Sequence, residues 1–286
     1  MRDVRLVTCA ALPAPDPDTP RLAAALTARG ASVEVADWRD GSVDWAGARV
    51  TLLRSPWDYA DDLDAFLTWA EGVAGVSALW NPLGLVRWNT HKAYLLELDS
   101  AGAPVVPTVM LTRGSAVELA GVADAQGWNA LVVKPAVGYG ANGVGRFDVG
   151  DPAAQRHVDA LLERGDVLVQ PYARTIEQEG ELSLVLVDGR ATHAVRKLPA
   201  PGDYRIHERY GGTFAPVAAS DGLVELGERV CGVLPEAPLY ARVDVLRGDG
   251  RWQVLEVEVT EPRLFLDLAP PAATDSLVDA VMARLA

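Results

Sequence analysis

The first third of the chain alternates between strand-like apolar runs and helix-like segments. Strands are predicted over residues 4–9, 32–38 and 49–53. A proline-rich loop over residues 12–20 follows the first strand, and Thr19 and Pro20 suit the start of a helix that Gly30 ends. A second helix is predicted over residues 61–69. Strands that alternate with helices at this spacing predict a parallel sheet.

The pattern changes in the middle of the chain. A break at Asn81-Pro82 precedes a predicted helix over residues 90–101. From about residue 104, short strands surround two further helices. These strands are predicted over residues 108–111, 131–133 and 167–170, and the helices over residues 115–126 and 152–163.

Two antiparallel hairpins are predicted in the last third of the chain. The turn Asp188-Gly189 separates strands over residues 182–187 and 191–195. The second hairpin pairs residues 239–245 with 252–259 around Gly248-Asp249-Gly250, and a final helix covers residues 276–285. An alternating start followed by hairpins indicates an α/β chain that passes into α+β architecture.

Composition narrows the class of protein. The 286 residues allow two domains or one elaborated domain. A formal net charge of −13 argues against a nucleic-acid partner, because duplex binding needs a basic face. No stretch reaches the ~18–20 apolar residues of a membrane span, and the N-terminus lacks a signal-peptide pattern, so a cytoplasmic protein is expected. Cys9 and Cys231 are expected to be buried free thiols.

Lysine is unusually scarce. Only Lys92, Lys134 and Lys197 occur among 26 basic residues, so each is a candidate for a position that needs a compact charge. Lys134 ends an apolar strand, and residues 138–145 then contain four glycines. Such a loop lets backbone N–H groups approach a phosphate, although it has neither the Walker A nor the Rossmann spacing. The alternative is a flexible surface loop.

Paired carboxylates give the sharpest chemical signal. Period two places Glu256 and Glu258 on one face of a predicted strand, and Asp244 and Arg242 lie on its hairpin partner. Three carboxylates around one point are hard oxygen ligands that suit Mg²⁺. The alternative is a solvated sheet face on which Arg242 is the partner of the acids.

Three further segments are candidates for binding. Gln170-Pro171-Tyr172 ends an apolar strand and suits either an adenine edge or a simple strand end. Residues 194–197 and 203–212 form a basic segment that is either an anion clamp or a mobile charged loop. Residues 54–59 follow a parallel strand at the edge where ligands bind, although their aromatic rings would equally suit packing on a neighbouring domain.

The order of these features resembles the ATP-grasp superfamily. The order along the chain is that of the glutathione synthetase and RimK-like branch. It runs from a first lysine to the strand lysine, the glycine loop, Gln-Pro-Tyr, a glutamate, the basic segment, an aspartate and Glu-x-Glu. Residues 54–59 and 256–266 are similar to the O-ureidoserine cyclo-ligases, which form cycloserine. The resemblance covers nearly the whole chain. It implies an ATP-grasp fold behind an N-terminal Rossmann-like pre-ATP-grasp domain.

The resemblance also implies roles for individual residues. Nucleotide contacts fall on Lys92, Lys134, Gly140, Asn142, Gly143, Gln170, Pro171 and Tyr172, with Glu177 or Glu181 at the ribose. The implied Mg²⁺ ligands are Asp244, Glu256 and Glu258. The implied phosphoryl-transfer residues are Arg196, Lys197, Arg205 and Arg242. The implied substrate contacts are Arg54, Trp57, Asp58 and Arg263.

The implied reaction is an ATP-dependent, ADP-forming ligation of a small amino-acid-like carboxylate to an amine through an acyl phosphate. The sequence leaves the two substrates open, and it leaves open whether the ligation closes a ring. Many relatives read Glu-x-Asn where this chain has Glu256-Val257-Glu258, so the extra charge would call for a second cation or a cationic substrate. The alternative class is a nucleotide-binding module of the same fold without turnover.

Three regions are expected along the chain. Residues 1–88 form the pre-ATP-grasp substrate-side domain, residues 89–168 the lid-bearing subdomain, and residues 169–286 the subdomain with the metal site. ATP is expected between the last two. Relatives of this kind are often dimers or tetramers, so a homodimer is a candidate assembly, although the sequence shows no interface.

Overall fold

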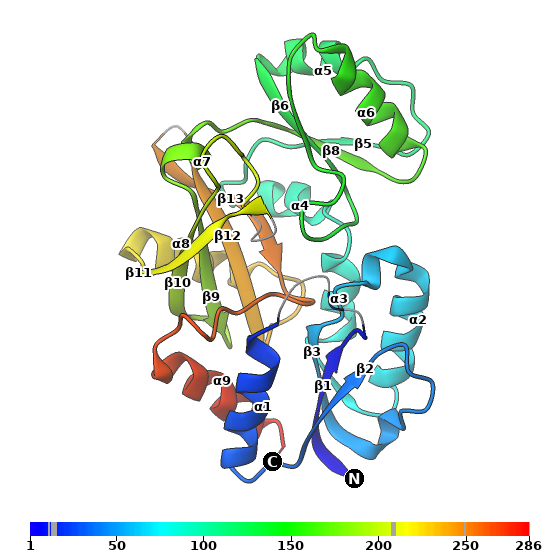
Figure 1. The fold of residues 1–286 in the computed structure, drawn as a ribbon, viewed down its shortest axis with the longest axis vertical. Coiled ribbons are helices and arrows are strands. Elements are labelled where there is room, and N and C mark those ends of the chain that lie inside the picture. The colour runs from blue at the N-terminus through cyan, green and yellow to red at the C-terminus, as the bar shows by residue number, and fades with distance from the viewer. Residues whose placement is uncertain (11, 13–15, 207–209, 249, 286) are drawn as a thin grey trace.

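Three β-sheets build the protein, and each carries its own covering helices (Figure 1). The structure is a computed structural model that describes residues 1–10, 12, 16–206, 210–248 and 250–285. The chain passes from the first sheet through two short helices to the second sheet, and then enters the third. No helix among these residues is long and apolar enough to cross a membrane.

The first sheet is parallel, as the alternating pattern predicts. Its strands follow the order β2-β1-β3-β4. They are β1 (Arg2–Thr8), β2 (Val33–Asp37), β3 (Ala48–Ser55) and β4 (Ala78–Trp80), with the single-turn helices η1 (Trp45–Gly47) and η2 (Tyr59–Asp61) beside them. Helix α1 (Asp18–Ala28) packs against one face and α2 (Leu63–Ala74) against the other. Because neighbouring strand residues point to opposite faces, Leu6 joins the α1 core and Val7 the α2 core.

The cap of α1 differs from the sequence prediction. The Asp16 carboxylate accepts the backbone N–H groups of Asp18 at 3.0 Å and Thr19 at 3.2 Å. Asp16 therefore supplies the acceptor that was assigned to Thr19, and the helix begins at Asp18. Residues 13–15 of the predicted loop lie outside the described residues.

Two short helices lie in this part of the chain: the helix predicted over residues 90–101 begins later than expected, and a helix that was not predicted precedes it. They are α3 (Leu83–Asn89) and α4 (Tyr94–Ser100). Between them the backbone N–H of Lys92 donates to the carbonyl of Ala136 at 2.9 Å, which interrupts the helical hydrogen bonding. Lys92 consequently sits in a turn beside the second sheet.

The second sheet is antiparallel and has the order β5-β8-β6-β7. Its strands are β5 (Val109–Leu111), β6 (Ala130–Pro135), β7 (Gly145–Asp148) and β8 (Val167–Pro171). Helices α5 (Leu119–Gln126) and α6 (Pro152–Leu162) cover one side, at the top of Figure 1. Strand β8 runs through the limit expected between residues 168 and 169, and both of its halves pair within this sheet.

The third sheet contains both predicted hairpins and has the order β11-β10-β9-β12-β13. Its strands are β9 (Glu181–Val187), β10 (Arg190–Leu198), β11 (Thr213–Val217), β12 (Tyr240–Gly248) and β13 (Arg251–Glu258). Asp188 and Gly189 take φ values of 47° and 74°, which suit the tight turn of the first hairpin. Asp249, in the second predicted turn, lies outside the described residues.

Helices flank the third sheet as well. Helix α8 (Asp221–Gly232) packs on one face, α7 (Thr175–Gln178) lies near β12, and α9 (Pro271–Ala283) packs beside α1. Helix α8 and strand β11 were not predicted from the sequence. Cys9 and Cys231 are buried free thiols, as expected.

A buried polar joint ties the first sheet to the segment that follows β13. The Asp18 carboxylate accepts the N–H groups of Leu264, of Phe265 at 3.1 Å and of Leu266 at 2.8 Å. Arg54 at the end of β3 donates to the carbonyl of Pro262 at 2.8 Å and lies 4.0 Å from Asp18. The joint fixes residues 260–266 against the first sheet and so sets one wall of the cavity described next.

Candidate active site

A cavity of about 340 Å³ lies where the second and third sheets meet the loops of the first. Its lining comes from the end of β6 and the glycine loop, from β8, from the carboxylate face of β12 and β13, and from residues near Trp57. Most of the candidate residues of the sequence analysis meet here, although they come from distant parts of the chain.

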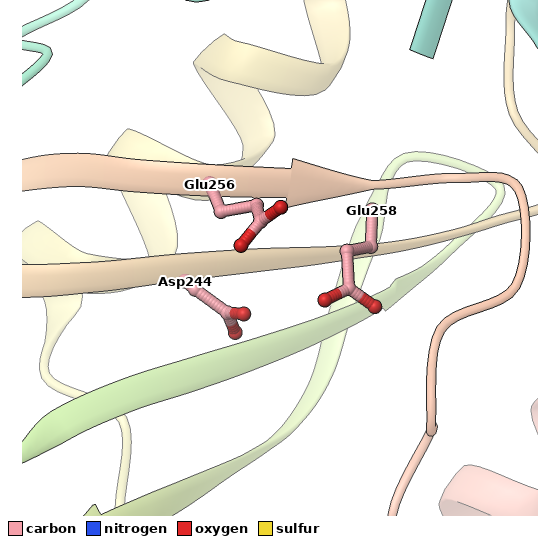
Figure 2. A group of neighbouring side chains, drawn as sticks. All are labelled: Asp244, Glu256 and Glu258. Atoms are coloured by element: carbon pink, nitrogen blue, oxygen red, sulfur yellow. The ribbon is translucent and has the colours of Figure 1, made fainter. Parts of the chain in front are cut away.

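A carboxylate triad, Asp244, Glu256 and Glu258, forms one side of the cavity. Asp244 on β12 pairs directly with Glu256 on β13, and Glu258 lies two residues further along the same face. Figure 2 shows the three carboxylates turned toward one another from the two neighbouring strands. One ligand oxygen from each lies within 4.8 Å of the others. Val257 between the two glutamates points into the core, so the alternation that the sequence predicts is present.

Basic side chains hold the triad together. Lys92 Nζ lies 2.9 Å from Glu256, and Lys197 Nζ lies 3.3 Å from Asp244. Arg242 contacts both Asp244, at 2.8 Å, and Glu258. Burial opposes the ionisation of Asp244, but Arg242 and Lys197 outweigh it and hold its pKa well below the usual range.

Glu258 differs from Asp244 in its electrostatics. Burial raises the pKa of Glu258 to about 7; Arg242 lowers it, and the neighbouring carboxylates of Asp244 and Glu256 raise it further. A bound divalent cation would relieve this repulsion. Because the triad offers hard oxygen donors within reach of one centre, its residues fit Mg²⁺.

Two lysines and the glycine loop form the opposite side. Lys134 ends β6 and is 8% exposed, and no described carboxylate lies within 4.0 Å of its ammonium group. Burial is also the main cause that lowers its pKa. Lys92 donates to the carbonyl of Gly138 at 3.0 Å and so ties the loop to the triad.

The loop backbone requires glycine at two of its turns. Gly140 and Gly143 take φ values of 58° and 72°, in the left-handed region. A Cβ at Gly143 would also lie 3.3 Å from Pro135 Cδ. Gly140 and Asn142 line the cavity, whereas Gly143 lies behind the lining, where its carbonyl bonds to His157.

One part of the cavity is lined by the end of β8. Gln170 is buried and donates to Thr108 at 2.8 Å, and Pro171 and Tyr172 continue the lining. Apolar walls of Val106, Leu246 and Leu255 face the same cavity. We call this part of the cavity the slot; its apolar walls suit a nucleobase.

The two candidate ribose ligands lie in different places. Glu181 lines the cavity and pairs with Lys197, and burial raises its pKa to about 7. Glu177 lies outside the lining and accepts the Tyr172 hydroxyl at 2.6 Å.

Three other candidates also lie away from the cavity. Arg54 belongs to the buried joint with Asp18, where its side chain is 1% exposed. Asp58 accepts Trp38 Nε1 at 2.6 Å and Arg39 Nε at 2.8 Å. Arg196 is exposed on β10, because alternate strand residues point to opposite faces and its neighbour Lys197 points inward.

The remaining candidates line the cavity. Arg205 pairs with Asp203 at 2.8 Å and lies over the ring of Tyr210, 3.7 Å from its centroid. Arg263 pairs with Asp267 at 3.2 Å, and Trp57 donates to the carbonyl of Glu261 at 3.0 Å. All three candidates face the same space as Arg242 and the triad.

Several lining residues were not named individually in the sequence analysis, although Tyr59 lies in its segment 54–59 and Glu261 and Phe265 lie in its segment 256–266. Glu261, Tyr59, Phe214 and Phe265 contribute side chains, and Asn89 donates to the carbonyl of Val257 at 2.7 Å and accepts the N–H of Val259 at 2.9 Å. A third acid shortly after Glu256 and Glu258 was a usable signal for Glu261. The other four carry no local pattern that separates them from core residues.

Comparisons with known proteins agree with this geometry. Residues 4–81 match the family model of the N-terminal domain of the D-cycloserine synthetase DcsG. Residues 101–269 match the ATP-grasp domain of prokaryotic glutathione synthetase. The cycloserine biosynthesis protein DcsG of Streptomyces lavendulae is 36% identical over 90% of this chain and 91% of its own length. A glutathione synthetase of Prochlorococcus marinus is 29% identical over 74% of this chain and 65% of its own.

Solved structures extend the comparison to three dimensions. The crystal structure of D-cycloserine synthetase DcsG superimposes with a TM-score of 0.90 and 32% identity over 99% of both chains. A D-alanine–D-alanine ligase of Bacillus anthracis shares the fold alone, with a TM-score of 0.69 and 15% identity over 100% of this chain and 97% of its own. The protein is thus an ATP-dependent ligase that forms carbon–nitrogen bonds. Within that class the chain belongs to the ATP-grasp family that contains DcsG and the prokaryotic glutathione synthetases.

Proposed function

We propose that the protein is a magnesium-dependent, ADP-forming ligase that activates the carboxylate of a small amino-acid-like substrate. The observation that carries the proposal is the placement of charge in one cavity. Lys134 is a buried cation without a described carboxylate partner, and it shares the cavity with the carboxylate triad. A polyphosphate with its metal ion complements both, since the phosphates pair with Lys134 and the metal with the triad.

The nucleotide would occupy the length of the cavity. Its base fits the slot at Gln170 and Tyr172, and its phosphates fit beneath the glycine loop beside Lys92 and Lys134. Glu181 is the better candidate for the ribose because it lines the cavity, whereas Glu177 is engaged by the Tyr172 hydroxyl. Mg²⁺ held by the triad would supply charge neutralisation at the phosphates.

The chain's own residues would then assist two displacements. A substrate carboxylate oxygen attacks the γ-phosphorus, the bond to the β–γ bridging oxygen breaks, and ADP leaves with an acyl phosphate formed. An amine next attacks the acyl carbon, and inorganic phosphate leaves with the carboxyl oxygen. Arg242, Lys197 and Arg205 are positioned to stabilise charge on the transferred group, which is the main catalytic requirement of such steps.

Ring closure within one substrate is the favoured form of the ligation. The relatives that match the whole chain are a cycloserine biosynthesis protein and a D-cycloserine synthetase. We therefore propose an O-ureidoserine-like substrate whose own nitrogen displaces the phosphate. A linear product that joins two separate substrates would contradict this form of the proposal.

A domain division accompanies the proposal. We propose a substrate-side domain over residues 1–88, a lid-bearing subdomain that includes all of β8, and a metal-bearing subdomain from Tyr172 onward. Keeping β8 whole is favoured because both of its halves pair with strands of the second sheet.

Nucleotide analysis tests the proposed function directly. The protein would be incubated with Mg-ATP, O-ureido-D-serine and hydroxylamine. ADP together with a hydroxamate is expected, because hydroxylamine intercepts an acyl phosphate. AMP with pyrophosphate would overturn the proposal, and nucleotide binding without turnover would favour a binding module.

A pair of variants assigns the activity to this cavity. Lys134→Met is expected to lower ADP formation by about 100-fold or more, since it removes a charge from the phosphate site. Arg156→Met on the exposed face of α6 removes the same charge away from the cavity and is expected to keep full activity. Equal activity in the two variants would contradict the phosphate assignment.

A further inference from the structure

Among the described residues, five carboxylates line the cavity, and one of them differs from the others in its partners. Glu181 pairs with Lys197, and the three acids of the triad pair with Lys92, Lys197 and Arg242. Glu261, which comes three residues after Glu258, is only 9% exposed. Among the described residues, no lysine or arginine lies within ion-pair distance of it. A buried carboxylate without a cation is costly, so a cationic ligand would stabilise it.

The surroundings of Glu261 fix it in place. The indole N–H of Trp57 donates to its backbone carbonyl at 3.0 Å, and the Tyr59 side chain lowers the pKa of its carboxyl group. The joint around Asp18 and Arg54 holds the residues that follow. Burial raises the pKa of Glu261 to about 8, repulsion from Glu258 adds to the effect, and the charge of Lys92 opposes it.

The chemistry of the subsite selects the kind of cation. Glu261 is not part of the group of acids close enough to share a metal ion, so a divalent metal would find one carboxylate there. The rings of Trp57 and Tyr59 line the cavity beside Glu261. An acid with aromatic neighbours suits a primary ammonium group, which combines an ion pair with attraction to ring faces.

We propose that Glu261, supported by Tyr59 and Trp57, binds the primary ammonium group of the amino-acid substrate. The inference deepens the proposed ligase function and rests on it. The proposed ammonium site also predicts how the substrate is oriented in the cavity. The ammonium group is attracted to Glu261 and repelled by the basic groups at Lys134 and Arg242, whereas the substrate carboxylate is attracted to those basic groups. A zwitterionic substrate is therefore held with its carboxylate toward the phosphoryl-transfer end.

A matched pair of substrates tests the ammonium site. The pair is O-ureido-D-serine and its des-amino analogue, which has a hydrogen in place of the ammonium group. Calorimetry in the presence of Mg²⁺ and a non-hydrolysable ATP analogue measures the binding of each, and hydroxamate formation measures carboxylate activation. Wild-type protein is expected to bind the amino compound at least about 100-fold more tightly, in keeping with a buried charge pair.

The variant Glu261→Gln is expected to remove that preference. Its affinity for the amino compound should fall about 100-fold, while its affinity for the des-amino analogue stays within about threefold of wild type. The unchanged affinity for the des-amino analogue guards against a folding defect in this variant. Tyr59→Phe keeps the carboxylate and should lower the preference less than Glu261→Gln does. Glu71→Gln is the control, because Glu71 forms an exposed ion pair with Arg87 at 2.9 Å, away from the cavity.

The outcomes separate the two proposals. Carboxylate activation with equal affinity for both compounds would overturn the ammonium site and leave the ligase function standing. A preference that persists in Glu261→Gln would also overturn the assignment to this residue. Failure to bind either compound, with no ADP formed, would overturn the proposed function and the ammonium site with it.

Discussion

Two buried clusters of charge in this protein have different kinds of partner. In the joint between the sheets, Asp18 is bound by backbone N–H groups of three consecutive residues, Leu264 to Leu266. In the triad, the partners of Asp244 are all side chains, namely Arg242, Lys197 and the Ser183 hydroxyl. Backbone donors cannot leave without local unfolding, whereas side chains change rotamer and exchange partners.

The contrast separates structural charge from functional charge. Asp18 is fully buried and Asp244 nearly so, at 0% and 2% exposure, so burial alone does not distinguish them. The two carboxylates are distinguished by the kind of group that donates to them. A carboxylate held by fixed donors supports the fold, while one held by exchangeable cations beside a cavity is able to accept a metal ion.

The largest effect on stability is expected from the joint. Asp18→Asn would leave the buried guanidinium of Arg54 without its nearby acid and would place an amide group against backbone N–H donors. We expect a loss of about 3 kcal/mol in the free energy of unfolding, measured by urea denaturation. Activity per folded molecule should fall much less than in the Glu256 variant described next, because the joint contacts no reacting group and acts only through the cavity wall that it holds. A large loss of turnover without destabilisation would break the comparison.

A substitution in the triad should affect activity more than stability. Glu256→Gln removes a proposed metal ligand while its side-chain oxygen still accepts a hydrogen bond from Lys92. ADP formation is expected to fall about 100- to 1,000-fold, because charge stabilisation at the phosphates is lost. The thermal midpoint should move by only a few degrees. Full activity in this variant would remove the triad from the mechanism.

Asn89 lies between the two types and sharpens the distinction. It lines the cavity, yet its amide bonds mainly to backbone groups, at Val257 and Val259 among others. Asn89→Ala is expected to cost about 1–3 kcal/mol of stability and to raise KM more than it lowers kcat, since Glu261 follows the segment it supports. Urea denaturation and steady-state kinetics on the same sample measure both effects.

Magnesium binding is expected to add stability through the triad. Mg²⁺ at a hundred times its Kd would stabilise the wild-type protein by about 2.7 kcal/mol if it binds the folded state alone. Glu256→Gln should lose most of this stabilisation, and Asp18→Asn should keep it. Thermal unfolding with and without Mg²⁺ measures the difference, and an equal shift in all three proteins would indicate binding elsewhere.

Local patterns made the parallel sheet, both hairpins and the carboxylate triad predictable. Period two on a strand defines which side chains share a face, so the amino-acid sequence alone was enough to bring Glu256, Glu258 and Asp244 together. The same rule applied to β10 separates Arg196 from Lys197. Both residues were catalytic candidates because they were grouped by charge and the strand period was not applied to them.

The misplaced and missed residues depend on contacts between distant parts of the chain. Arg54 ends a parallel strand, as a ligand-binding residue would, but its partners Asp18 and Pro262 come from the first helix and from 208 residues further along. Glu261 is distinguished by its lack of a lysine or arginine partner among the described residues, which only the assembled cavity shows. The partners of Arg54 and the missing cation at Glu261 both depend on contacts between distant residues, so no local sequence pattern predicts them.

Lys92 has a consequence for the order of events. One ammonium group bonds to the carbonyl of Gly138 in the loop and to Glu256 in the triad. The position of the loop and the charge available at the triad are therefore linked, and linkage of this kind is reciprocal. A change that weakens the ion pair between Lys92 and Glu256 also alters the hydrogen bond from Lys92 to Gly138. The glycine loop and the proposed metal site therefore respond to each other through a single side chain.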